Sequence, residues 1–221
     1  MNRSTRAPVI MTRTLALVLG MLALWLLPTA SQAAAENLIV NGDFELGNTG
    51  FATGYTYSPG NVAPQGTYTV DTNPLNNHPT RFSPCPDHTT GTGNMMIVNG
   101  AVQPGVVVWA QSVAVVPYHA YELAAWATAV ISRFPIQLQF SINTSPIDVL
   151  QVSSEACQWQ PLTAQWSSGA STTAVLRVVD LNTEEFGNDF ALDDLSLAVV
   201  GFSFGPNPTL VSPAANSHVA R

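Results

Sequence analysis

The segment "DHTTGTGN", residues 87–94, holds the residue types most capable of chemistry in this sequence. Asp87 and His88 place a carboxylate beside an imidazole, and two glycines flank Thr92. A phosphate-binding loop would need G-x-x-x-x-G-K-[ST], and a dinucleotide loop would need G-x-G-x-x-G at the start of a helix. No lysine follows here, and we expect no helix. His88 could act as a base, but such a run before glycine is more typical of a turn in which the aspartate accepts backbone N–H groups.

Carboxylates also occur where the expected strands begin and end. Hard oxygen ligands from separate strand ends suit calcium, which accepts irregular geometry with six to eight ligands. Adjacent carboxylates repel one another unless a cation or hydrogen-bond donors compensate them. The alternative is that these are ordinary charged turn residues, and spacing alone leaves both interpretations open. The candidate ligands are Glu45, Asp87, Asp193 and Asp194.

The first 33 residues have the pattern of a secretory signal peptide. Three arginines precede an unbroken apolar run over residues 15–27. That run is shorter than the roughly 20 residues that a membrane span needs, and "SQA" at residues 31–33 offers the small residues that a signal peptidase recognises. We expect cleavage after Ala33, with Ala35 as the second choice. An uncleaved anchor is the alternative.

The remaining chain is strongly acidic. Without the signal peptide it has four arginines, no lysine and 14 acidic residues, which gives a formal charge of −10. Such a chain repels phosphate backbones and has no cluster of basic residues for nucleic acid. We therefore expect no nucleic-acid partner and no membrane span in the mature chain.

Two cysteines, Cys85 and Cys157, remain in a chain that we expect to enter an oxidising compartment. They are expected to pair, because exported proteins retain disulfides. Two thiols alone cannot form a structural zinc site. Two free thiols are the alternative.

From residue 37 onward, apolar residues recur in short runs separated by turn residues, which is typical of strands. The pattern predicts an all-β fold, a two-sheet antiparallel β-sandwich or jelly roll. Residues 121–131 also have the composition of a short helix, but the prolines at 117 and 135 favour a strand. The expected strands are 37–40, 67–70, 94–98, 106–115, 121–131, 136–142, 147–152, 162–167, 173–181 and 190–200.

Three regions follow from these patterns: a signal peptide over 1–33, a jelly-roll domain over 34–200, and an extended tail or linker over 201–221. A length near 190 residues suits one domain with a sizeable core. The tail is rich in Gly, Pro, Asn and Ser.

The strand pattern fades over residues 51–86, which predicts functional or capping loops around one short strand. An aromatic face can cover the apolar side of a sugar ring while polar neighbours bind its hydroxyl groups. Tyr55, Tyr57 and Phe82 lie in this segment among Asn, Thr and Gln. We expect them to be exposed and to contact a ligand. The tryptophans inside strand patterns are expected to pack in the core.

Three motifs resemble known extracellular domains. "NLIVNGDFELG" and "NDFALDDLSL" resemble the terminal strands of galactose-binding-domain-like jelly rolls, a group that includes many bacterial carbohydrate-binding modules. "DHTTGTGNMMIVNGA" is similar to the Asp-His-Thr-x-Gly-x-Gly segment of MAM-type adhesion domains, which usually have four cysteines rather than two. The resemblance spans residues 36–200. It implies that Glu45, Asp87 and Asp194 meet around a structural calcium ion, with Asp43 and Asp193 as supplements.

The sequence therefore predicts a secreted or cell-surface, non-catalytic module that binds carbohydrate or another extracellular polymer. One alternative is an adhesion or matrix module that binds protein through a flat patch of exposed aromatic residues. Another is a jelly-roll glycosidase or polysaccharide lyase. A hydrolase would need two carboxylates about 5 to 10 Å apart across a cleft, with Glu184 or Glu185 facing Asp71 or Asp148.

Overall fold

A computed structural model describes residues 36–200 of the chain. The predicted signal peptide and the predicted tail lie outside these residues. Among the residues described, none forms a helix long and apolar enough to cross a membrane. The strands are β1 (Thr56–Tyr57), β2 (Thr67–Asp71), β3 (Met95–Asn99), β4 (Val107–Ala114), β5 (Ala120–Ala129), β6 (Ile136–Ile142), β7 (Ser145–Val152), β8 (Gln160–Ser167), β9 (Thr173–Asp180) and β10 (Asp189–Val199).

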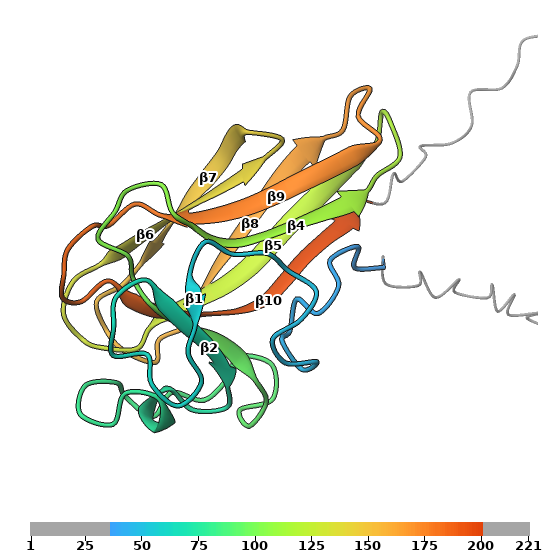
Figure 1. Cartoon of the computed structure of the whole chain (residues 1–221). Coiled ribbons are helices and arrows are strands. Elements are labelled where there is room, and N and C mark those ends of the chain that lie inside the picture. Colours follow the sequence, from blue (N-terminus) through green and yellow to red (C-terminus); the bar gives the residue numbers. More distant parts are fainter. Residues whose placement is uncertain (1–35, 201–221) are drawn as a thin grey trace, which may run out of the picture. The chain divides into compact units, whose positions relative to one another are not determined.

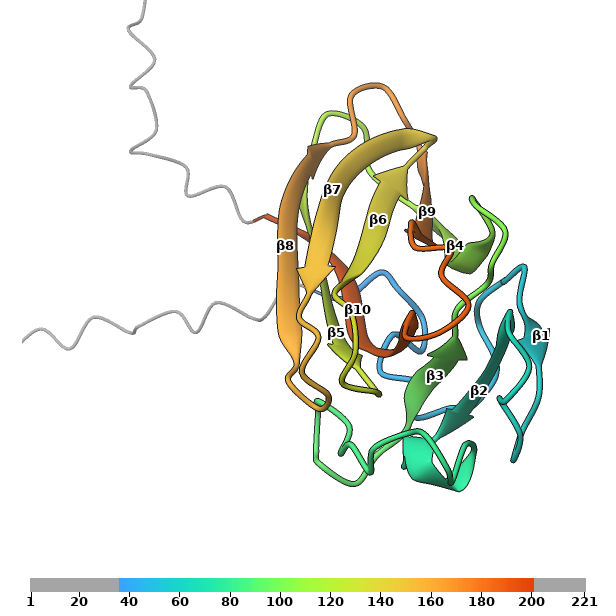
Figure 2. The ribbon, with the colours of Figure 1, turned by 90° about the vertical axis from the view of Figure 1, so that its left-hand side faces the viewer.

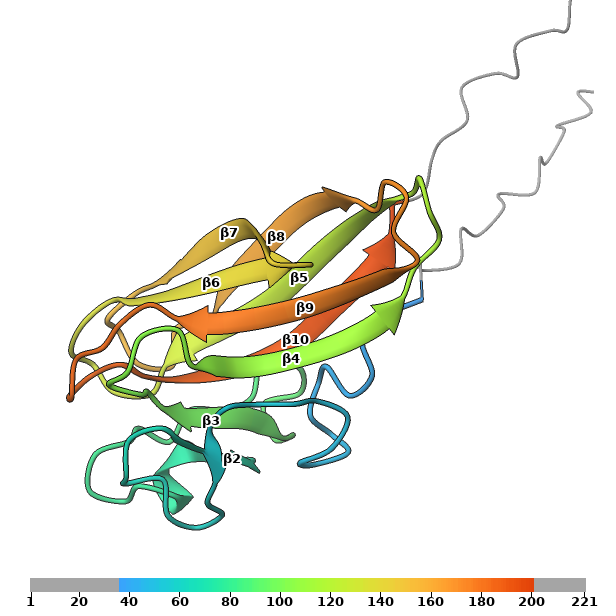
Figure 3. The ribbon, with the colours of Figure 1, turned by 45° about the horizontal axis from the view of Figure 1, so that its top comes forward.

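These strands form two sheets that pack face to face (Figures 1 and 3). The six-stranded sheet has the order β1-β2-β3-β10-β5-β8, and the four-stranded sheet has the order β4-β9-β6-β7. All pairs are antiparallel except β1 with β2. The predicted two-sheet antiparallel β-sandwich is confirmed.

The main core lies between the sheets, and strand periodicity explains it. Ile136, Leu138 and Phe140 of β6 are buried, whereas Gln137 between them is exposed, because successive side chains point to opposite faces of a strand. Each such apolar side chain contributes about 1.5–3 kcal/mol when it leaves water. Residues 120–129 also form a strand as predicted, paired with β8 and β10.

Residues 37–40 do not form the expected strand. Asn37 explains why: its side-chain oxygen accepts hydrogen bonds from the backbone N–H groups of Ile39 and Leu197, each at 3.0 Å. In a paired strand these N–H groups would donate to backbone carbonyl groups; here they donate to the Asn37 side chain instead. One backbone bond remains, from Leu38 N to Leu197 O at 2.9 Å.

The long segment 58–94 covers part of the outer face of the six-stranded sheet. It includes strand β2, which belongs to that sheet, and one short 3-10 helix, η1 (Pro74–Asn76). Figure 2 shows this segment in blue-green and green, with β2 beside β3. Its Val62 and Phe82 pack in a second apolar cluster with residues of β3, β5–β6 and β10, namely Met95, Ile97, Val130 and Ala191. The sandwich therefore buries both faces of β3 at this end.

The predicted disulfide between Cys85 and Cys157 is confirmed, with Cα atoms 4.9 Å apart. It joins segment 58–94 to the connection between β7 and β8. Two backbone bonds lie beside it, from Ser83 N to Val130 O at 2.8 Å and from Cys157 N to Ala129 O at 3.0 Å. The end of β5 therefore contacts both half-cystine segments.

Asp180, the last residue of β9, is a buried carboxyl group. It accepts hydrogen bonds from Asn182 N at 2.9 Å and from Asn188 Nδ2 at 3.4 Å. Burial raises the pKa of Asp180 to about 7 despite these bonds, and the charges of Glu184 and Asp189 act in the same direction. The folded protein therefore holds this proton at pH values where the unfolded chain has lost it.

This difference predicts a protein that is more stable in mild acid. Between the usual pKa of Asp180, 3.8, and its folded value of about 7, the free energy of unfolding falls as pH rises. We expect a melting temperature several degrees higher at about pH 5 than at about pH 8. Asp180→Asn should narrow that difference, whereas Asp148→Asn, at an exposed residue of β7, should leave it unchanged. An undiminished difference in Asp180→Asn, measured by calorimetry, would contradict the assignment.

Candidate functional site

Four of the predicted metal-binding carboxylates lie within the segment 87–94 or contact it. We call these four residues the acidic cluster: Glu45, Asp87, Asp193 and Asp194. Asp87 is buried and accepts backbone N–H groups from Thr90 at 2.8 Å and from Gly93 at 2.7 Å. Glu45 accepts the N–H of Asn94 at 2.7 Å. The expected turn around Asp87 is therefore present, and it contacts the segment before β1.

His88 and Thr89 connect this turn to β10. The His88 N–H donates to Asp193 Oδ2 at 2.9 Å, and its ring Nδ1 lies 2.6 Å from Asp194 Oδ2. The Thr89 hydroxyl donates to Asp194 Oδ1 at 2.7 Å. The ring of His88 also stacks on Trp126, with centroids 3.8 Å apart. His88 therefore has a positioning role, and Trp126 lies on the outer face of its sheet rather than in the main core.

A β-bulge in β10 makes these contacts possible. The register of β10 against β5 shifts between Asp193 and Ser196, and Asp194 has a positive φ of 50°. The two adjacent carboxylates can therefore both face residues 88 and 89 instead of alternating across the sheet. Burial raises the pKa of Asp193 to about 7, and the charges of Asp194 and Asp87 act in the same direction.

Two glycines permit the close approach of the three segments. A Cβ atom at Gly93 would lie 2.1 Å from Glu45 Oε1 and 3.0 Å from Asp87 Oδ2. A Cβ atom at Gly42 would lie 2.0 Å from Leu195 O, beside the bulge. At Gly42 the clash is with backbone, so another residue would push the segments apart, and at Gly93 it would displace the Glu45 carboxylate. Within "TGTGN", Gly93 therefore permits close packing, whereas Gly91 has a positive φ of 83° and open space around it.

The acidic cluster has the oxygen chemistry that calcium prefers, but protein donors already occupy its members. Within residues 36–200 no group of three or more His, Cys, Asp or Glu side chains is arranged to hold a metal ion. Asp43 is exposed and borders a separate cavity of about 400 Å³ beside Asp194 and Trp126. Calcium therefore stays a prediction from the sequence, and we derive no function through it.

The predicted ligand-binding aromatics do not form one surface. Tyr55 is buried, and its hydroxyl accepts the N–H of Ala101 at 3.0 Å. Phe82 is buried in the second apolar cluster. The expected exposure of both was wrong: Tyr55 packs in the main core, and Phe82 is buried because segment 58–94 folds back onto the sheet. Tyr57 is 43% exposed and lies against Tyr68, so its role in binding stays a prediction.

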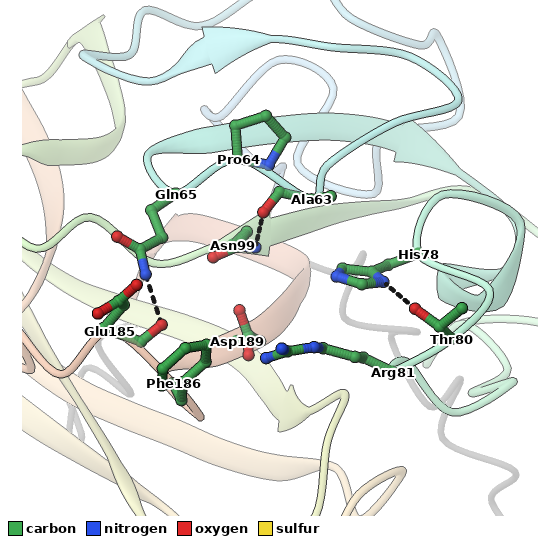
Figure 4. A pocket seen from close by; sticks show the side chains of 10 residues that line it. All are labelled: Ala63, Pro64, Gln65, His78, Thr80, Arg81, Asn99, Glu185, Phe186 and Asp189. Carbon is green, nitrogen blue, oxygen red and sulfur yellow. Dashed lines mark hydrogen bonds between the residues drawn. The ribbon is translucent and has the colours of Figure 1, made fainter.

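A cleft of about 520 Å³ lies where segment 58–94 meets the loop between β9 and β10 (Figure 4). Phe186, 41% exposed, lines it together with groups that can form hydrogen bonds. Some of these groups are held in place: Gln65 Nε2 donates to Glu185 O at 2.6 Å, and Asn99 Nδ2 donates to Ala63 O at 3.2 Å. The cleft is lined by Ala63, Pro64, Gln65, His78, Thr80, Arg81, Asn99, Glu185, Phe186 and Asp189.

Backbone contacts at Val130 position the elements around this cleft. Val130 N donates to Asp189 O at 3.1 Å, and Val130 O accepts Ser83 N at 2.8 Å. The start of β10 and the segment that carries Arg81 are thus joined to the end of β5. Gly187, with a φ of 93°, has no side chain where a Cβ atom would lie 2.9 Å from Arg133 Cδ. This allows the β5–β6 turn to pack against the loop that carries Phe186.

The charged groups of the cleft influence one another. Burial raises the pKa of Asp189 to about 6, while the N–H of Gly187 and the charges of Arg81 and Arg133 oppose that rise. Burial and the charge of Arg81 lower the pKa of His78. The cleft therefore combines an aromatic ring, which suits an apolar ligand face, with amides, a guanidinium and a buried carboxyl, which suit ligand hydroxyl groups.

Sequence reasoning missed this cleft. Phe186 and Arg81 come from loops more than 100 residues apart, and neither belongs to a recognisable motif. The available signal was the rarity of positive charge, because the chain outside the signal peptide has only four arginines. The glycosidase alternative required Glu184 or Glu185 to face Asp71 or Asp148 across a cleft. Glu185 does line the cleft, but the other carboxyl group that lines it belongs to Asp189.

No protein-family model matches the chain, and no curated protein matches it. Solved structures do share its fold. The chain is 13% identical to the Stig cyclase Fisc from Fischerella sp. TAU, covering 76% of this chain and 98% of that one, with a TM-score of 0.52. This likeness shows the fold alone.

Two carbohydrate-binding modules are more distant in structure. The CBM22-1 xylan-binding domain of Paenibacillus barcinonensis Xyn10C is 14% identical, over 77% of this chain and 98% of that one, with a TM-score of 0.45. A family 16 carbohydrate-binding module is 17% identical, over 73% and 99%, with a TM-score of 0.41. These likenesses do not decide the function, and the resemblance to MAM-type domains stays a prediction.

The hydrogen bonds of Asp87 predict that Asp87→Ala destabilises the fold. The change leaves two backbone N–H groups without their charged acceptor, and each such bond contributes about 1.5–3 kcal/mol. We expect the free energy of unfolding, measured in urea, to fall by at least about 2 kcal/mol. Glu155→Ala, at an exposed residue, is the control. Equal stability of the two variants would show that Asp87 is dispensable.

Calcium can be tested separately. An ion that binds only the folded state raises the melting temperature, so a chelator should lower it if calcium is bound. We expect EDTA to lower the melting temperature of the wild type, and excess calcium to restore it. An unchanged melting temperature would contradict a bound calcium ion, and hydrogen bonds alone would then stabilise the acidic cluster.

Proposed function

We propose that this protein is a secreted, non-catalytic module that binds a carbohydrate polymer in the cleft beside Phe186. The observation that carries the proposal is the exposed ring of Phe186 among fixed polar groups in an open cleft. A sugar ring has one apolar side, which an aromatic face covers, and hydroxyl groups, which amides, guanidinium and carboxyl groups bind. The secreted location rests on the predicted signal peptide.

The geometry of the cleft favours a polymer over a compact small molecule. The cleft is open to solvent at the end of the sandwich and continues past Phe186 into a second cavity, with which it shares Thr80 and Arg81. A ligand longer than one sugar unit can therefore contact Phe186 from both cavities. Phe186 and Phe134 line cavities rather than a flat patch, so a carbohydrate fits this surface better than the flat protein partner expected for an adhesion module.

The enzyme alternative keeps one observation in its favour, which is the raised pKa of Asp189 beside Glu185 in the cleft. A carboxyl group with a raised pKa can serve as a general acid.

The pattern G-x-S-x-G also occurs at residues 201–205, outside the described residues, and by itself is a weak signal for a serine hydrolase. The glycosidase alternative has a test of its own. Release of reducing ends from a bound polysaccharide would favour the enzyme.

Phe186→Ala tests the proposed binding site. We expect the wild type to bind at least one polysaccharide in an array, and Phe186→Ala to lower that affinity by about tenfold in affinity electrophoresis, which corresponds to about 1.4 kcal/mol. Tyr118→Ala is the control, because Tyr118 is 78% exposed and lies in the turn between β4 and β5, at the opposite end of β5 from the cleft.

Tyr57→Ala tests the one exposed aromatic residue predicted from the sequence. Wild-type affinity in Phe186→Ala together with weak binding in Tyr57→Ala would move the site to Tyr57. Absence of binding to every polysaccharide in the array would contradict the proposed function and favour the adhesion alternative.

A further inference from the structure

We propose that the cavity next to the cleft, on the Arg133 side of Phe186, binds the acidic group of a uronic acid unit in the polysaccharide. This inference rests on the proposed function and names its substrate class: an acidic polysaccharide. The cavity measures about 360 Å³ and is lined by Thr80, Arg81, Ile131, Arg133 and Phe186.

The charge of this cavity is opposite to that of the protein. Outside the predicted signal peptide the chain has four arginines and no lysine, against 14 acidic residues. Two of the four arginines line this one cavity, and no carboxylate lines it. A chain that is otherwise acidic repels polyanions, so their binding would require a local site of this kind.

Both guanidinium groups are held by rings rather than by carboxylates. The Cζ atom of Arg81 lies 4.8 Å from the ring centroid of Phe186, and that of Arg133 lies 5.6 Å from the same centroid and 5.5 Å from that of Phe134. Over residues 36–200 the one ion pair within 4.0 Å joins His88 and Asp194. Contact with a ring face leaves the N–H edges of a guanidinium available to a ligand.

The carboxylates of Asp189 and Glu185 line the cleft and not this cavity. The charges of Arg81 and Arg133 reach Asp189 and oppose the rise of its pKa, but neither arginine forms an ion pair with it. Glu184 lines a third cavity beside Phe134 and Pro135. The two guanidinium groups therefore keep their hydrogen-bonding capacity for an anion from outside.

The chemistry of guanidinium favours a carboxylate as that anion. Its planar set of donors matches the two oxygens of a carboxylate, and such charge-assisted pairs are roughly twice as strong as neutral hydrogen bonds. Arg81 and Phe186 border both the cleft and the cavity. A polymer that crosses the ring of Phe186 would place one sugar unit in the cleft and the carboxylate of the next between Arg81 and Arg133.

The experiment compares polygalacturonate with its methyl ester, which removes the charge and keeps the sugar chain. We expect the wild type to bind polygalacturonate at least about tenfold more tightly than the ester in isothermal titration. Arg81→Gln and Arg133→Gln should each remove most of that preference. Arg177→Gln is the matched control, because Arg177 lies in β9 and lines neither cavity. The melting temperature of each variant verifies its folding.

Two further polyanions identify the anionic group. If dextran sulfate replaces polygalacturonate as the ligand that binds and that needs both arginines, the result contradicts the proposed carboxylate and assigns the cavity to sulfated sugars. Equal binding of poly-L-glutamate would overturn the sugar specificity, because charge alone would then suffice.

The failure of this inference differs from the failure of the proposed function. Equal affinity for polygalacturonate and its ester, with binding still lost in Phe186→Ala, would overturn the acidic substrate and leave the carbohydrate-binding function intact. No binding to any polysaccharide would overturn both. If Arg81→Gln and Arg133→Gln keep the same preference for polygalacturonate as Arg177→Gln, the cavity is not the binding site.

Discussion

The apolar contact between segment 58–94 and the outer face of the six-stranded sheet is the constraint on which the functional end of this protein depends. Val62 and Phe82 leave solvent by packing on Met95, Ile97 and Ala191. Outside β2, this segment has one short 3-10 helix as its regular structure, and burial of apolar surface offsets the entropy lost when the segment is ordered. The cleft and the acidic cluster both use residues of this segment.

Covalent and polar contacts hold the second half of this segment at several points. The disulfide at Cys85 lies four residues after Arg81 and two before Asp87. The Ser83–Val130 bond lies on one side of it, and the His88–Asp193 bond lies on the other. Arg81 and the acidic cluster are therefore positioned by the same short stretch of chain. Loss of the cluster should disturb the cleft as well as the stability of the fold.

The distribution of charge gives the two regions different roles. At the acidic cluster, backbone N–H groups and the side chains of His88 and Thr89 compensate carboxylates from three segments, and the result is a structural contact. At the other cavity, two guanidinium groups contact rings and have no carboxylate partner among the residues described. Satisfied charges stabilise a fold, whereas charges without an internal partner are available to a ligand.

The sequence by itself determined the strands and the disulfide. Nine of the ten predicted strands are present, because alternation of apolar and polar residues is a local property that fixes which face each side chain takes. A family resemblance, not the residues alone, implied that Glu45, Asp87 and Asp194 share a cation; the structure places Glu45 and Asp194 in hydrogen bonds with Asn94 and His88, and the cation stays a prediction. The strand at 37–40 failed because one side chain, Asn37, replaced backbone pairing.

Only the tertiary structure decided which loop residues face solvent and which meet. A loop has no periodicity, so the sequence cannot distinguish the buried Phe82 from the exposed Arg81 beside it. Arg81, Arg133 and Phe186 belong to three separate connections, and they converge because β5 and β10 are neighbours in the sheet and segment 58–94 packs across their ends. Long-range packing brought them together, and no local pattern in the chain records it.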